Sequence, residues 1–171
     1  MEVVPQEEAR FLLRSSLTVL TSCAFAAYFG FYDFLMTSTA VLLCSINYWR
    51  RPVYGWRRNI DMLNITVCTL YHTWRALQLS GVYFFGYIGF VTIGVTCYVI
   101  GRSLQVLGAY AHSGMHISGN IANAFLYTGM YSGRPAASHI LLITMAILGV
   151  IWLSFTPLRH QTDSPCERLE D

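Results

Sequence analysis

The chain has 171 residues, a formal net charge of +2, 54% hydrophobic residues and 12% charged residues. Soluble domains carry about 25% charged residues, so this composition argues against a soluble protein and predicts a membrane protein. The small positive charge gives no reason to expect nucleic acid as a partner. The five cysteines stand singly, without a CxxC pair, and are expected to be buried thiols.

Six apolar segments are candidates for membrane-spanning helices, because about 20 apolar residues cross the hydrocarbon core of a bilayer. In chain order they cover about residues 11–30, 34–49, 60–79, 82–100, 104–127 and 138–156. We therefore expect an all-α, polytopic transmembrane helix bundle over residues 1–157, followed by a flexible cytoplasmic tail over 158–171. Its expected surroundings are the lipid bilayer.

The short loop between the second and third segments contains Arg50, Arg51, Arg57 and Arg58. Short cytoplasmic loops collect basic residues, so this loop is predicted to lie inside. With an even number of spans, both termini are then cytoplasmic. A second interpretation of the same loop is a binding site for anionic lipid headgroups.

Polar side chains recur along the fifth segment. His112, His116, Asn120 and Asn123 are spaced by four, four and three residues, which stacks them on one face of a helix. Polar groups within a membrane usually face the bundle interior or a wet cavity. We therefore treat this polar stripe as a candidate functional site.

Two arrangements of the stripe with other residues agree with the predicted depths. In the first, His72 meets His112 and His116 near mid-membrane, and three neutral imidazoles bind zinc, whose bound water acts in a hydrolysis. In the second, Ser45 and Asp61 join the two histidines nearer the cytoplasmic face. Asp61 and His72 are eleven residues apart, about 16 Å along a helix, so they cannot ligate one ion together.

Two other interpretations remain open. The polar residues can hydrogen-bond across helices, which contributes about 1 kcal/mol and fixes helix register, while Asp61 pairs with Arg57 or Arg58. Alternatively, His72 and His116 are the two axial ligands of a haem.

Three short motifs resemble the pattern of the CREST membrane hydrolases, which include alkaline ceramidases, adiponectin receptors and haemolysin III-like proteins. They cover residues 45–49 (SINYW), 57–61 (RRNID) and 112–116 (HSGMH). The resemblance implies a zinc-dependent hydrolase of a lipid amide or ester. It also implies that His112 and His116 bind the metal and that Ser45 and Asp61 complete the site.

The chain departs from the CREST pattern at Trp49, which stands where the family has a zinc-ligating histidine. Either His72 supplies the missing ligand or the site no longer hydrolyses a substrate. The competing hypothesis is a non-catalytic membrane protein whose polar stripe packs helices or lines a path for a small solute.

Overall fold

The computed structural model describes residues 4–104 and 107–131, and the sixth predicted span and the tail lie outside them. The described residues form helices with no strand, so the all-α prediction is confirmed for them. The helices are α1 (Gln6–Leu17), α2 (Val19–Tyr28), α3 (Tyr32–Trp49), α4 (Trp56–Ala76), α5 (Gly81–Ser103) and α6 (Gly108–Met130).

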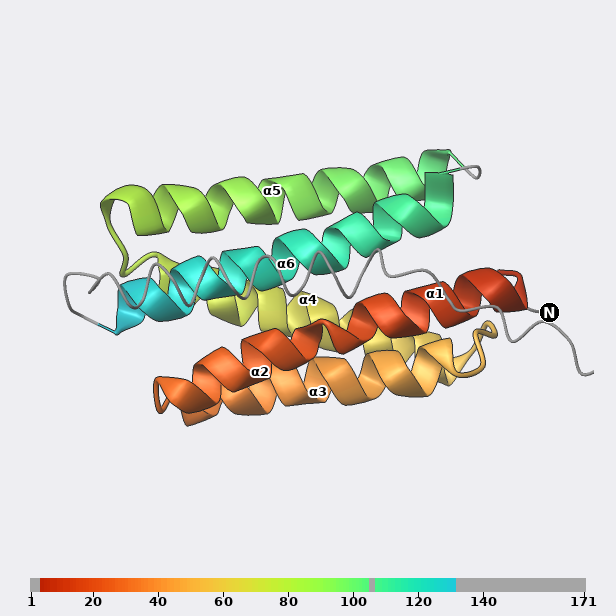
Figure 1. The fold of residues 1–171 in the computed structure, drawn as a ribbon, viewed down its shortest axis with the longest axis horizontal. Coiled ribbons are helices and arrows are strands. Elements are labelled where there is room, and N and C mark those ends of the chain that lie inside the picture. Colours follow the sequence, from red (N-terminus) through yellow and green to blue (C-terminus); the bar gives the residue numbers. More distant parts are fainter. Residues whose placement is uncertain (1–3, 105–106, 132–171) are drawn as a thin grey trace, which may run out of the picture.

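The helices lie lengthwise beside one another in an elongated bundle (Figure 1). The helix that carries the polar stripe, α6, packs against α5, α1, α2 and α4, while α3 packs against α1, α2 and α4. In Figure 1, α6 lies between α5 on one side and the α1–α2 pair on the other. The polar stripe is thus inside the bundle.

The helices α1 and α2 form one nearly continuous rod with a break at Thr18. At this point hydroxyl groups bond to backbone carbonyls of the preceding turn: Thr18 donates to the carbonyl of Ser15 at 2.6 Å, and Thr21 donates to that of Thr18 at 2.8 Å. Such bonds compete with the backbone ladder and bend helices. The break therefore follows from the local sequence.

Glycines allow α5 and α6 to approach each other closely. A Cβ atom on Gly94 would lie 2.9 Å from Oγ of Ser118, and one on Gly86 would lie 2.5 Å from the ring of Phe125. A Cβ atom on Gly89, in contrast, would meet nothing within 4 Å. Gly86 and Gly94 are thus required by packing, as small residues are at helix interfaces in membranes.

Side chains on α4 are distributed in the reverse of the pattern in a soluble protein. The exposed side chains on one face are apolar: Leu63, Val67, Leu70 and Trp74, followed by Leu77 just after the helix. Those buried on the other face include Asp61 and His72, which are 3% and 5% exposed. A surface helix of a soluble protein turns its apolar stripe toward the core, so α4 is turned the opposite way.

The same reversal extends to neighbouring helices. On α5, Phe85 is 72% exposed, and Val82, Val95 and Val99 are also exposed. The polar residues buried in the bundle include Ser15, Ser22, Ser38, Ser45, Ser113 and Asn120. The bundle also has an apolar core, built around Phe34, Tyr87, Leu126 and Tyr127. Its interior thus contains both apolar and polar side chains.

By length and apolar composition, two helical stretches of the described chain could cross a membrane. They are Gln6–Tyr28, which joins α1 and α2, and Gly81–Ser103, which is α5. Of the remaining helices, α4 carries Arg57 and Arg58 in its first turn, and α6 carries the polar stripe. These two stretches are the evidence from helix length and composition for association with a membrane.

Candidate functional site

The polar stripe of α6 belongs to a hydrogen-bonded chain across four helices, which we call the α6 network. Its members are Thr18, Ser22, Thr37, His72, Asn120 and Asn123. Asn120 is at its centre: its Oδ1 accepts from Ser22 at 2.6 Å, and its Nδ2 donates to Thr18 at 2.9 Å and to the carbonyl of His116 at 2.8 Å. Asn120 therefore uses both of its amide hydrogens.

Asn123 connects the network to α4. Its Nδ2 donates to Oγ of Ser22 at 3.1 Å, and its Oδ1 accepts from Nδ1 of His72 at 3.0 Å. A neutral imidazole has one N–H group, so Nε2 of His72 accepts from the hydroxyl of Thr37, which lies 2.9 Å away. Both ring nitrogens of His72 are thus occupied by protein partners.

The structure does not bring His72 to His112 and His116, so the first arrangement is not the one observed. His72 bonds to Asn123, which is seven residues, or about 10 Å, further along α6 than His116. The predicted depths were wrong because α4 begins at Trp56, earlier than expected, and α6 begins later than expected. The same separation excludes His72 and His116 as axial ligands of one haem.

The two histidines of the stripe do lie side by side, next to Trp49. The ring centroids of His112 and His116 are 4.9 Å apart, and those of His112 and Trp49 are 5.1 Å apart, both pairs in edge-to-face contact. Nδ1 of His116 lies 2.9 Å from Oγ of Ser15, which itself donates to the carbonyl of Leu12. His116 therefore carries its proton on Nδ1 and keeps the lone pair of Nε2.

Ser45 and Asp61 are brought together at the same end of the bundle. Oγ of Ser45 donates to Oδ1 of Asp61 at 2.7 Å, and both side chains are buried. Ser45 lies one helical turn before Trp49, whose ring contacts His112. The carboxylate of Asp61 is thus paired with a serine, and the alternative pairing with Arg57 or Arg58 is not formed, since Asp33–Arg75 is the ion pair found in the described part of the chain.

No three metal-binding side chains meet in the part of the chain that the structure describes. Groups of three or more His, Cys, Asp or Glu residues that could hold a metal ion are absent from it. His112 and His116 can offer two imidazoles, and a third ligand would have to come from another group. Zinc at this site stays a prediction.

Sequence reasoning missed a polar cluster at the other end of α4. Asp33 accepts hydrogen bonds from the hydroxyl of Tyr71 and from the guanidinium of Arg75, which also lies 4.9 Å above the ring of Phe34. A signal was present, because Tyr71 and Arg75 are four residues apart and Asp33 starts the neighbouring helix. These hydrogen bonds connect the first turn of α3 to the last turns of α4.

The fold and the site together define a class: an all-helical bundle with a hydrogen-bonded polar interior and an apolar exterior. Comparisons with protein-family models, with curated proteins and with solved structures give no match for this chain. The resemblance to the CREST hydrolases therefore depends on the three motifs alone.

Proposed function

We propose that this chain is a multi-pass integral membrane protein, with about six spans and both termini cytoplasmic, whose polar stripe holds the helices together. The observation that carries the proposal is the reversed distribution of side chains on α4. Soluble monomers rarely expose apolar patches larger than a few hundred Å². In a bilayer, apolar side chains face lipid and polar ones face the bundle interior.

The orientation follows from the loop between α3 and α4. Its four arginines favour the cytoplasmic side, and the connection between α4 and α5 is then outside. Two accessible positions test this: Tyr54 in the first connection and Ser80 in the second, both exposed.

The test uses the full chain without its native cysteines, carrying either Tyr54→Cys or Ser80→Cys. A maleimide that cannot cross membranes should label Ser80→Cys in intact cells, and Tyr54→Cys only after permeabilisation. The reverse labelling would overturn the orientation. Release of the chain from membranes by alkaline carbonate would overturn membrane insertion itself.

The role of the stripe in packing is supported by how its groups are satisfied. Asn120 and Asn123 bond to side chains of α2 and α4 and to Thr18 at the break between α1 and α2. Interhelical hydrogen bonds in membranes contribute about 0.6 kcal/mol on average. A network of this size is therefore sufficient to fix the register of α6 against its neighbours.

A metal-dependent hydrolase of a lipid amide or ester is a second candidate. Two contacts favour it: Ser45 bonds to Asp61, and Trp49 lies against His112. Residue 49 is the position at which the CREST pattern has a zinc-ligating histidine. Zinc, when bound, would activate a water for hydrolysis. His112 and His116 would hold the ion.

The zinc content of the purified full chain separates the two candidates. The packing role predicts no stoichiometric zinc and an unchanged zinc content in His112→Ala and His116→Ala. The hydrolase predicts about one zinc per chain, lost in both variants together with any amide or ester hydrolysis. Trp74→Ala, on the exposed face of α4, is the matched control, because it removes an aromatic ring away from the site.

A further inference from the structure

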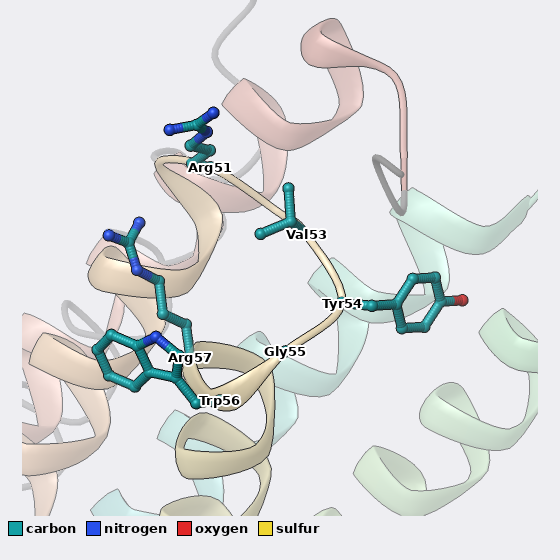
Figure 2. A pocket seen from close by; sticks show the side chains of 6 residues that line it. All are labelled: Arg51, Val53, Tyr54, Gly55, Trp56 and Arg57. Carbon is teal, nitrogen blue, oxygen red and sulfur yellow. The ribbon is translucent and has the colours of Figure 1, made fainter.

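The loop between α3 and α4 lines an open hollow of about 250 Å³ at the surface (Figure 2). It is lined by Arg51, Val53, Tyr54, Gly55, Trp56 and Arg57. Figure 2 shows Arg51 and Arg57 extending on the same side of the loop, with Tyr54 on the other. Arg51 and Arg57 thus contribute to the lining of one hollow from the same side of the loop.

The arginines of this loop have no carboxylate partner among the residues that the structure describes, where the ion pair found is Asp33–Arg75. Two of them are oriented instead by aromatic rings: the guanidinium of Arg57 lies 5.6 Å from the ring of Trp56, and that of Arg58 lies 5.5 Å from the ring of Tyr54. A guanidinium group stacked on an aromatic face, like that of Arg57, keeps its N–H donors available for an anion.

The backbone adds positive potential at the same place. Gly55 precedes α4 with φ of 150°, and it provides no side-chain cap for the first turn of the helix. That turn contains Arg57 and Arg58 and no acidic residue. Basic residues at a helix N-terminus add to the positive end of the dipole rather than offsetting it, so an anion placed in the hollow would relieve the repulsion.

The position of the hollow indicates where the anion comes from. Tyr54 and Trp56 are each 63% exposed, and such aromatic residues gather at the headgroup level of membranes. Arginine is suited to phosphate because its planar group donates two parallel hydrogen bonds. Arginines and exposed aromatic rings at the membrane face match the phosphate-bearing, polar end of a phospholipid.

We propose that this hollow binds the phosphate of an anionic phospholipid headgroup through Arg51 and Arg57. The inference rests on the proposed membrane insertion. The bound lipid bridges the end of α3 and the start of α4, and it favours the orientation with this loop on the side of the membrane that is rich in anionic lipid.

The test compares full-length protein in nanodiscs of phosphatidylcholine alone and in nanodiscs with one fifth phosphatidic acid. The wild type should retain phosphatidic acid in native mass spectrometry and gain thermal stability from it. The double variant Arg51→Gln/Arg57→Gln should bind it at least about tenfold more weakly, because both arginines would lose their charge-assisted hydrogen bonds to the phosphate. The control Arg10→Gln/Arg14→Gln removes equal charge from exposed positions of α1, outside the hollow, and should bind like the wild type.

Other outcomes would overturn the proposal. Equal weakening in the control would show attraction by net charge and no site. Inorganic phosphate that stabilises the protein in phosphatidylcholine discs as strongly as phosphatidic acid does would assign the hollow to a soluble phosphate. A chain that stays in the disc without preferring phosphatidic acid refutes the hollow alone, whereas a chain recovered in buffer without lipid refutes membrane insertion as well.

Discussion

Replacement of Asn120 by alanine tests whether the stripe holds the helices together. Asn120 is 6% exposed and makes three hydrogen bonds, to Ser22, to Thr18 and to the carbonyl of His116. Asn120→Ala removes all three and leaves the hydroxyl of Ser22 without its acceptor. The variant should fold into the same helices with a lower free energy of unfolding.

The magnitude follows from these three bonds. Two of them, to Ser22 and Thr18, are interhelical; such bonds in membranes average about 0.6 kcal/mol and reach about 1.7 kcal/mol, so the loss of both costs roughly 1–3 kcal/mol. The buried hydroxyl of Ser22, which still accepts from Asn123 but has lost its own acceptor, adds about 1 kcal/mol. We expect Asn120→Ala to lower the free energy of unfolding by about 2–4 kcal/mol.

The assay is reversible unfolding in mixed micelles, with the fraction of sodium dodecyl sulfate as denaturant and helix content by circular dichroism as the signal. Asn59→Ala is the matched control, because Asn59 lies in the first turn of α4 with an exposed side chain. It should change the free energy by less than about 0.5 kcal/mol. If Asn120→Ala were as stable as Asn59→Ala, the network would not be what joins α6 to α1 and α2.

Three further predictions address other parts of the bundle. Gly94→Val should destabilise the protein by about 1–3 kcal/mol, because the valine side chain would clash with Ser118 of α6. Gly89→Val should be tolerated in the same unfolding assay, because a Cβ atom at residue 89 meets nothing within 4 Å. Trp49→His should raise the zinc content measured by mass spectrometry toward one ion per chain, because residue 49 already lies against the histidine pair of α6; an unchanged content would show that the three positions do not converge. A double-mutant cycle with Asp33→Asn and Arg75→Gln should give a coupling of about 0.5–1 kcal/mol that falls with salt, as for a partly exposed pair, and a coupling of zero would mean that the pair adds no stability.

Five of the six predicted apolar segments correspond to helices of the structure, because hydropathy and helix length are properties of the local sequence. The break at Thr18 was not predicted, although the hydroxyl groups that cause it are local too. The sixth segment lies outside the described residues. The number of spans thus stays part of the proposal.

The site shows where sequence reasoning ends. The face shared by His116, Asn120 and Asn123 follows from helical periodicity, and the structure keeps it. Their partners on other helices, such as Ser22, depend on the tertiary arrangement and were not predicted. The expected meeting of His72 with the histidine pair failed because two helix starts were each misplaced by four residues, and each error shifts a residue by about 6 Å along its axis.

The α6 network runs in one direction, and this restricts what can stand in it. Thr37 donates to His72, His72 to Asn123, Asn123 to Ser22, and Ser22 to Asn120, so every bond in the series points the same way. A carboxylate in place of either amide could accept but not give. The two asparagines are therefore coupled through Ser22: a substitution at one changes whether the other position needs a hydrogen-bond donor or an acceptor.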